Sequence, residues 1–167
     1  MNLSHPTPER PGPGQESVWD YPRPPRLERT TQEIEVVLGG QVIARTAAPL
    51  RLLETSHPPT YYLPMSSFTR GALRPATGGS TCEWKGRASY LDLLGGDRVA
   101  EQAGWFYPSP TAAYAAIVDH LALYPGLMDR CTVDGEVVQP QPGGFYGGWV
   151  TSRVVGPFKG DPGTMSW

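Results

Sequence analysis

The sequence lacks long apolar segments. No stretch approaches the ~18 consecutive apolar residues that a membrane-spanning helix requires. The first residues, Met1 to Gly14, are polar and rich in proline, without the apolar stretch that a secretory signal peptide contains. We therefore expect a cytoplasmic protein with no membrane partner.

Charged and metal-binding residues are also scarce. Only 18% of the residues are charged and the formal net charge is −2 at pH 7, which excludes the basic surface that binds nucleic-acid phosphates. The two cysteines, Cys82 and Cys131, lie far apart, and the three histidines stand at spacings unrelated to them. These spacings match neither a zinc motif nor a disulfide framework. We predict no metal, no cofactor and no nucleic-acid partner.

Glycine and proline, by contrast, are abundant. The 167 residues include 20 glycines and 19 prolines, whereas average usage is about 7% and 5%. This composition favours turns and excludes a mostly helical bundle, and the length is that of one domain. We interpret residues 1–16, which are rich in proline, as a disordered tail. Residues 17–167 are predicted to form a single β-rich domain.

Two short hairpins carry the clearest strand signals. In each, a pair of turn residues that tolerates positive φ separates two runs of β-branched and apolar residues. The pairs are segments 33–38 and 41–45 around Gly39-Gly40, and segments 131–133 and 136–138 around Asp134-Gly135. These signals predict a small, mainly β (α+β) fold with antiparallel pairing.

One segment, about 109–124, has the pattern of an amphipathic α-helix. Ser109 and Pro110 suit the N-cap and the first helical position. Apolar residues then recur at i, i+3, i+4 and i+7, at Tyr114, Ile117, Val118 and Leu121. This spacing gives a helix one apolar face. We predict a single helix here that packs on the sheet.

The final segment, 140–167, combines glycine with aromatic residues. It contains Phe145, Tyr146, Trp149, Phe158 and Trp167. A flexible linker would not carry so much aromatic surface. We therefore predict an ordered extension with one strand near Trp149 to Val155. The same segment could instead reach a second copy of the chain, so a homodimer is possible.

Several short motifs together resemble the family called domain of unknown function 427. They are the segments 16–22 (ESVWDYP), 53–59 (LETSHPP), 61–64 (YYLP), 82–86 (CEWKG) with Tyr90, 105–108 (WFYP) and 133–135 (VDG). The resemblance covers about residues 16–167, and segments 143–149 and 156–160 resemble a longer actinobacterial-type branch. Many members have Pro and Tyr after the cysteine. Here Glu83 and Trp84 stand at those positions, so no role of that proline is carried over.

The resemblance implies a small antiparallel β structure with one helix, similar to the β-tent of methionine sulfoxide reductase B and of a zinc-binding Rab-associated chaperone. It implies no activity. A nucleotidyltransferase-like label exists for the family, but that chemistry needs carboxylates that hold metal ions, and the sequence contains no Asp-x-Asp. Glu33 and Glu35 alternate with apolar residues, as on the solvent side of a strand. The residues therefore do not favour nucleotidyl transfer.

Cys82, Lys85 and His57 are the candidate catalytic residues. A lysine near a thiol lowers its pKa and makes it a better nucleophile, and a bulge or bend at Gly86 could bring Cys82 and Lys85 into one pocket. Alternatively, Cys82 is a small core residue and Lys85 a surface charge. His57, just before Pro58, is either a loop residue or a general base at the rim of the pocket.

The candidate ligand-binding residues are Arg51, Glu54 and Lys85 together with five aromatic residues. Arg51 lies on an otherwise apolar strand, where it is either paired with Glu54, exposed, or holding a carboxylate or phosphate in a cavity. Five aromatic residues follow on consecutive predicted strands. If they share a face, they line a pocket with Arg51 and Lys85 as anchors; otherwise they form the core of a small barrel. They are Tyr61, Tyr62, Trp84, Trp105 and Tyr107.

These residues leave three functions open. We favour a protein that binds an unidentified small molecule in an aromatic pocket and whose activity is unassigned. The alternatives are a non-catalytic interaction or oligomerisation module, and a cysteine-dependent redox or transfer enzyme in which Cys131 serves as the second thiol. The favoured hypothesis requires Cys82 and Arg51 to share one cavity.

Overall fold

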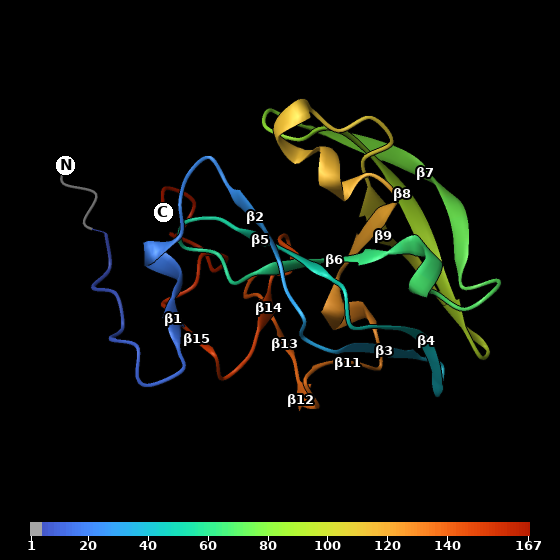
Figure 1. The fold of residues 1–167 in the computed structure, drawn as a ribbon, viewed down its shortest axis with the longest axis horizontal. Helices are drawn as coiled ribbons and strands as arrows, with labels where there is room; N and C mark the ends of the chain where they lie inside the picture. Colours follow the sequence, from blue (N-terminus) through green and yellow to red (C-terminus); the bar gives the residue numbers. More distant parts are fainter. Residues whose placement is uncertain (1–4) are drawn as a thin grey trace.

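The computed structural model describes residues 5–167 and is built mainly from antiparallel β-sheet (Figure 1). The largest sheet has seven strands, and every neighbouring pair in it is antiparallel. Their order is β2 (Arg26–Arg29), β5 (Leu50–Leu53), β6 (Thr60–Pro64), β10 (His120–Leu123), β9 (Arg98–Phe106), β8 (Gly86–Gly95) and β7 (Leu73–Cys82). β2 and β7 are its edges, so within the described residues the sheet does not close into a barrel.

A second sheet has four antiparallel strands and contains both predicted hairpins. Its order is β12 (Glu136–Val137), β11 (Arg130–Val133), β3 (Ile34–Leu38) and β4 (Gln41–Thr46). Gly39 and Gly40, with φ of 60° and 75°, make the turn between β3 and β4. Asp134 and Gly135, with φ of 49° and 83°, make the other. Both hairpin predictions are confirmed, because these residues adopt the left-handed conformation that a two-residue turn needs.

Alternation along the strands creates two apolar clusters. The inner cluster lies between the two sheets and includes Ile34 and Val36 from β3 with Tyr61 and Leu63 from β6. The outer cluster lies on the opposite face of the seven-stranded sheet. Its members include Leu50, Leu52, Tyr62, Ala88, Tyr107, Tyr114, Ile117 and Ala122. Because successive side chains of a strand point to opposite faces, neighbouring residues of β5, β6 and β10 serve different clusters.

The predicted amphipathic α-helix over 109–124 is wrong. Ala112–Ile117 forms a 3-10 helix (η3) that is interrupted at Tyr114, and the chain then enters β10. Tyr114 and Ile117 are buried, but their three-residue spacing also suits a 3-10 helix. Beyond them the chain runs in the centre of the sheet between β6 and β9. There Leu121 to Leu123 are buried on both faces of the sheet. Leu121 belongs to this continuous apolar run, and it completes the i, i+3, i+4, i+7 pattern without being in a helix.

A second correction concerns Gly86, where a bulge or bend within a strand was considered. It belongs instead to a hairpin, in which Cys82 of β7 pairs with Gly86 of β8. Gly86 has φ of 107°, a conformation that glycine adopts without strain. The three residues between them, Glu83 to Lys85, therefore form the hairpin turn.

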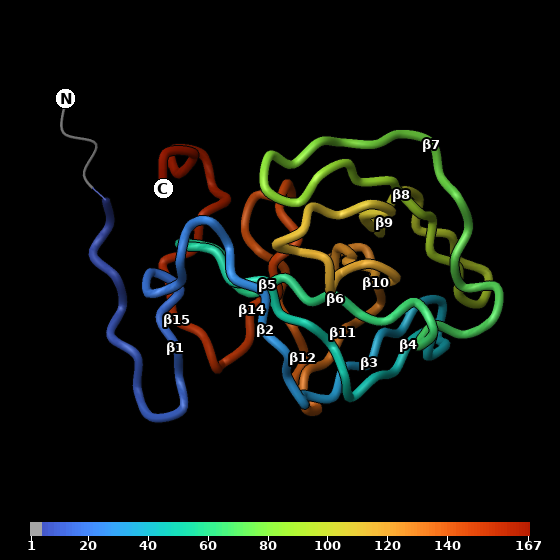
Figure 2. Tube along the Cα trace, turned by 45° about the horizontal axis from the view of Figure 1, so that its top comes forward, coloured from blue at the N-terminus to red at the C-terminus, as the bar shows by residue number. Residues whose placement is uncertain are grey.

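The C-terminal extension is ordered and packs on the domain from which it comes. β14 (Trp149–Val150) pairs with β13 (Gln139–Pro140), and β15 (Val154–Val155) runs parallel to β1 (Glu16–Ser17). Trp149 is completely buried and its ring lies 5.0 Å from that of Tyr61. Figure 2 shows the C-terminal chain returning beside the N-terminal segment. The strand expected near 149–155 is thus two short strands separated by a turn.

Three further 3-10 helices complete the fold: η1 (Val18–Asp20), η2 (Met65–Ser67) and η4 (Pro125–Leu127). Part of the predicted tail, residues 1–4, lies outside the described residues. Glu9 contacts the extension, where its N–H donates to the carbonyl of Gly156 at 2.8 Å. No helix within residues 5–167 is long and apolar enough to cross a membrane.

Candidate functional site

A cavity of about 450 Å³ lies on the outer-cluster side of the seven-stranded sheet, at the turn of the β7–β8 hairpin. Three parts of the chain enclose it: the hairpin turn, the strands β6 and β9, and the segment 141–159. Its lining includes Glu54, His57, Tyr62, Cys82, Trp84, Lys85, Trp105, Tyr107, Gln141, Phe145, Tyr146 and Lys159. The structure therefore brings together most of the residues singled out from the sequence.

The hairpin turn positions Trp84 and Lys85 at the edge of the cavity. Thr111 holds the turn: its hydroxyl donates to the carbonyl of Trp84, and its N–H donates to the carbonyl of Lys85 at 3.0 Å. The ammonium of Lys85 lies 5.5 Å above the ring of Tyr107, within the range of a cation–π contact. Cys82 precedes the turn and lines the same cavity. The turn thus brings the thiol and the amine into one cavity.

Glu54, His57 and Gln141 form a chain of polar contacts along one wall. His57 Nε2 lies 3.3 Å from Glu54 Oε2, and His57 Nδ1 lies 3.0 Å from the amide nitrogen of Gln141. The Gln141 amide is oriented by Gly148, whose N–H donates to Oε1, and by Lys159, whose carbonyl accepts from Nε2. Gln141 therefore donates to Nδ1, and the proton of neutral His57 lies on Nε2 and points to Glu54. Neither ring nitrogen is free to act as a general base.

Glu54 is an anion held by its neighbours. Arg23 Nη2 lies 3.2 Å from Glu54 Oε2. Burial disfavours the charged carboxylate, but the hydrogen bond from His57 and the positive charges of Arg23 and Lys85 outweigh it, so the pKa of Glu54 lies below its ordinary value. The only acidic side chain among the residues lining the cavity is therefore engaged by His57 within the lining and by Arg23 from outside it.

The hydroxyl of Tyr62 is buried in the cavity wall without a partner. Tyr62 has no exposed surface, and within residues 5–167 its Oη makes no hydrogen bond of ordinary geometry; the polar groups of Trp105 and Tyr107 lie near it and partly oppose the effect of burial on its pKa. Ser56 Oγ and Trp149 Nε1 are likewise buried and unpaired, but neither residue lines the cavity. Burial raises the pKa of Tyr62 and Tyr107 well above the ordinary value, so both phenols keep their protons. Tyr62 thus offers a donor to any acceptor that reaches it.

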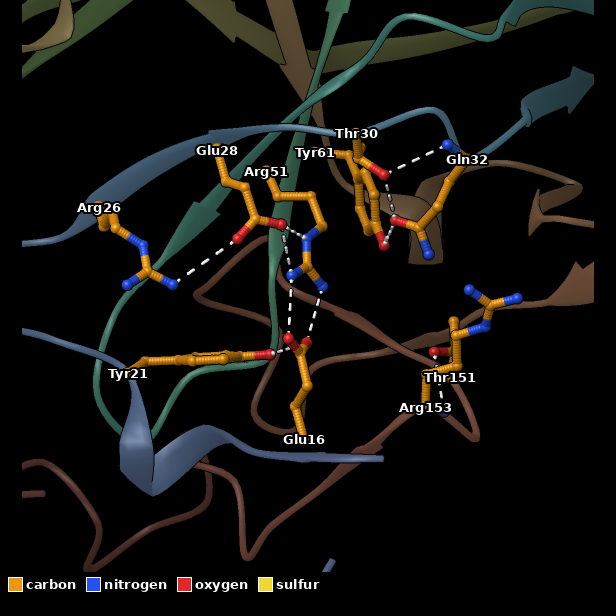
Figure 3. A network of polar contacts seen from close by, with 10 residues as sticks. All are labelled: Glu16, Tyr21, Arg26, Glu28, Thr30, Gln32, Arg51, Tyr61, Thr151 and Arg153. Atoms are coloured by element: carbon orange, nitrogen blue, oxygen red, sulfur yellow. Dashed lines mark hydrogen bonds and ion pairs between the residues drawn. The ribbon is translucent and has the colours of Figure 1, made fainter. Parts of the chain in front are cut away.

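Arg51 is not part of this cavity, contrary to the prediction. It lies on β5 beside Leu50 and Leu52, which belong to the outer cluster, and so points to the opposite face of the sheet. There its guanidinium donates to Glu16 at 2.9 and 3.2 Å and to Glu28 at 2.8 and 3.2 Å (Figure 3). The expected common cavity of Cys82 and Arg51 does not form, because the two side chains lie on opposite faces of the sheet. The ligand-binding hypothesis that required this shared cavity is therefore wrong as stated, and a ligand site can rest only on the residues that do line the cavity. Arg51 instead ties β1 to β5 and to the edge strand β2 of the sheet.

Tyr61 also points away from the cavity. It belongs to the inner cluster, and its hydroxyl donates to Gln32 Oε1 at 2.9 Å (Figure 3). Its neighbour Tyr62 points the other way because the two residues are consecutive in β6. Four of the five aromatic residues proposed for a pocket, Tyr62, Trp84, Trp105 and Tyr107, therefore line the cavity, and one does not.

Sequence reasoning missed the wall contributed by the C-terminal extension. Lys159 supplies the second cation of the cavity in place of Arg51; its ammonium lies 5.6 Å above the ring of Tyr146 and donates to the carbonyl of Trp167 at 3.4 Å. Tyr146 packs edge-on against His57 at 4.7 Å. The aromatic content of 140–167 predicted an ordered segment, but no sequence signal linked it to this cavity.

The two cysteines are free and lie apart. Cys131 is buried in the inner cluster, where burial raises its pKa to about 12. Cys82 packs against the outer cluster on the other side of the sheet. Cys131 is therefore not placed to act as a second thiol for Cys82. Within the described residues, no three His, Cys, Asp or Glu side chains are grouped to hold a metal ion.

A larger and more open depression of about 670 Å³ adjoins the cavity and shares Tyr90, Tyr124, Gln141 and Tyr146 with it. Its lining contains neither lysine nor cysteine. Ionisable and nucleophilic groups instead converge in the smaller cavity, which makes that cavity the candidate site.

A family model described as domain of unknown function (DUF427) matches residues 26–134, which is more than half of the chain. The chain belongs to the DUF427 family. A search of curated proteins finds no match. The DUF427 match includes Glu54, His57, Tyr62, Cys82 and Lys85, but ends before Gln141, Phe145, Tyr146 and Lys159. The DUF427 region thus supplies most of the residues that line the cavity, and the extension beyond the matched region supplies the rest.

Proposed function

We propose that this protein binds a flat, aromatic small molecule in the cavity between the β7–β8 hairpin and the C-terminal extension. The observation that carries the proposal is the unpartnered hydroxyl of Tyr62 in an aromatic-lined cavity. Leaving a buried donor without an acceptor costs about 1–3 kcal/mol, and such a group calls for a partner. A ligand with an acceptor atom supplies that partner.

The other lining side chains suit a planar ligand. Trp84 and Trp105 are only half-buried, and the ring of Trp105 packs at a tilt of 49° against that of Tyr124, with 4.8 Å between the centroids. A planar molecule gains area burial and ring–ring contacts from such walls, worth about 0.5–1.5 kcal/mol for each pair. Because the hydroxyl of Tyr62 is covered in the free protein, a ligand atom reaches it when one of the half-buried lining side chains shifts.

The tryptophans themselves provide the test. We would titrate the ¹⁵N-labelled protein with 2-naphthol and follow the indole N–H resonances by NMR. Those of Trp84 and Trp105 should shift and saturate. Trp149, buried between the sheets, and Trp19, whose indole N–H donates to Pro157 at 2.9 Å, lie outside the cavity and serve as internal controls. Shifts at Trp84 and Trp105 that are absent, or no larger than those of the controls, would overturn the proposal.

A matched pair of variants locates the binding site. Phe145 lines the cavity although 71% of its surface is exposed, whereas Met165, which is 65% exposed, lies elsewhere in the same extension. Phe145→Ala should weaken 2-naphthol binding about two- to tenfold, the equivalent of one aromatic contact. Met165→Ala should leave binding unchanged. Equal effects of the two variants would contradict the assigned site.

A further inference from the structure

Lys85 is a cation of the cavity that makes no direct ion pair with another described residue. Within residues 5–167, no carboxylate lies within ion-pair distance of its ammonium. Its ammonium lies over the ring of Tyr107, and the residue is half-buried. A lysine that is partly removed from water without a carboxylate is favourably placed to bind an anion.

The rest of the cavity does not neutralise this charge. Glu54 is the only acidic residue among those lining it, and Arg23 already pairs with that carboxylate at 3.2 Å. Lys159 adds a second ammonium, which donates to a main-chain oxygen of Trp167, a residue that does not line the cavity. His57 carries its proton toward Glu54 and offers the cavity no negative charge. The lining is therefore net positive.

Tyr62 lines the same cavity as Lys85 and adds a neutral hydrogen-bond donor. Its hydroxyl has no acceptor within the described residues, and an ionised oxygen is a stronger acceptor than a neutral one. A carboxylate or phosphate can accept from both an ammonium and a phenol, because each carries at least two acceptor oxygens. The two donors thus suit the acid group of a ligand, and the aromatic walls suit a ring at its other end.

We infer that the cavity selects an aromatic anion, whose carboxylate or phosphate group is held by Lys85 and Tyr62 and whose ring lies against Trp84 and Trp105. This inference rests on the proposed function and specifies the class of ligand. It assigns Lys85 the role of the specificity-determining cation and requires no covalent step.

The test compares three probes that share one ring system: 2-naphthoate, 2-naphthyl phosphate and the neutral 2-naphthamide. Binding is followed by the indole resonances of Trp84 and Trp105. At least one anion should bind about tenfold or more tightly than the amide, since a charge-assisted hydrogen bond is about twice as strong as a neutral one. The tighter of the two anions identifies the acid group.

Substitutions assign the preference to Lys85. Lys85→Met keeps most of the apolar stem and should remove the preference for the anion while changing amide binding less than about threefold. Lys85→Arg should retain the preference. Arg87→Met is the matched control: it removes a positive charge two residues further along, from an exposed side chain that does not line the cavity, and should also retain the preference.

The outcomes separate the two proposals. If the amide and both anions bind equally, or if the preference survives in Lys85→Met, the anion inference is wrong while the binding function stands. If neither 2-naphthol nor any of the three probes shifts the resonances of Trp84 and Trp105, the binding function fails and the inference fails with it.

Discussion

At the scale of single residues, Tyr61 and Tyr62 show how neighbours in sequence acquire opposite roles. Both are buried, but Tyr61 donates to Gln32 on the inner side of the sheet, whereas Tyr62 has no hydrogen-bond partner on the cavity side. The hydroxyl of Tyr61 therefore stabilises the fold, and that of Tyr62 destabilises the ligand-free protein.

The same substitution should consequently have opposite effects at the two positions. Tyr62→Phe should raise the free energy of unfolding by up to about 1 kcal/mol, because it removes an unpaired buried donor. Tyr61→Phe should lower it by about 0.5–1.5 kcal/mol, because a hydrogen bond is lost. Urea denaturation followed by tryptophan fluorescence measures both, and a destabilised Tyr62→Phe would indicate that the hydroxyl has a partner in solution.

Residue chemistry alone identified Glu54, His57, Tyr62, Cys82 and Lys85 as candidates, and the fold brings them to one cavity. Their function stays a prediction. Arg51 was an equally reasonable candidate from its chemistry. However, β5 carries leucines on both of its faces, so its sequence does not show which face lies toward the cavity. That choice depends on the partners of the strand, which local sequence does not specify.

At the scale of elements, a network of charges joins β1, β2 and β5. Arg51 is 8% exposed and lies between Glu16 and Glu28, and Tyr21 donates its hydroxyl to Glu16 at 3.0 Å. The hydrogen bond from Arg51, opposed by partial burial, lowers the pKa of Glu16 below the ordinary value. The short strand β1 is thus tied electrostatically to the domain.

This network predicts a defined loss of stability in acid. Because the pKa of Glu16 is lower in the folded than in the unfolded chain, its contribution is complete above the unfolded value of about 4.5 and is lost as the pH falls through the folded value. Between pH 6 and pH 3, Glu16→Gln should therefore lose less stability than the wild type. Chemical denaturation at several pH values measures this, and parallel pH profiles for the two proteins would refute it.

The segment 109–124 shows why elements are harder to assign than residues. Its apolar positions fit a helix, yet the chain forms η3 and then β10. β10 completes the seven-stranded sheet by pairing with both β6 and β9, and those hydrogen bonds are invisible to a local pattern. The hairpins at Gly39-Gly40 and Asp134-Gly135 were predictable because their turn residues and both strands are local.

At the scale of the whole molecule, the C-terminal extension is part of the fold as well as of the cavity wall. Trp149 is completely buried in the inner cluster, and its backbone N–H donates to the carbonyl of Pro59 at 2.8 Å. The extension should therefore be required for folding, in addition to any role it has in contacts between copies.

Two aromatic residues of the extension provide the comparison. Trp149→Ala should lower the free energy of unfolding by about 3–5 kcal/mol, the usual cost of truncating a large core side chain. Phe145→Ala, at a position that is 71% exposed, should change it by less than about 0.5 kcal/mol. Thermal and urea unfolding would show the difference, and similar stabilities of the two variants would mean that the extension is dispensable.

Local chemistry in the chain was enough to indicate the β-rich class, both tight hairpins, the ordered extension and the membership of the DUF427 family, because turn residues, alternation and short motifs act over a few neighbours. The tertiary fold settled which side of each strand faces which cluster. As a result, Arg51 and Cys82 lie on opposite faces of the sheet, and part of the segment with a helical pattern forms the central strand β10. Lys159 and Lys85 line the same cavity. Such outcomes depend on contacts between distant segments, whose free energies no short stretch of sequence contains.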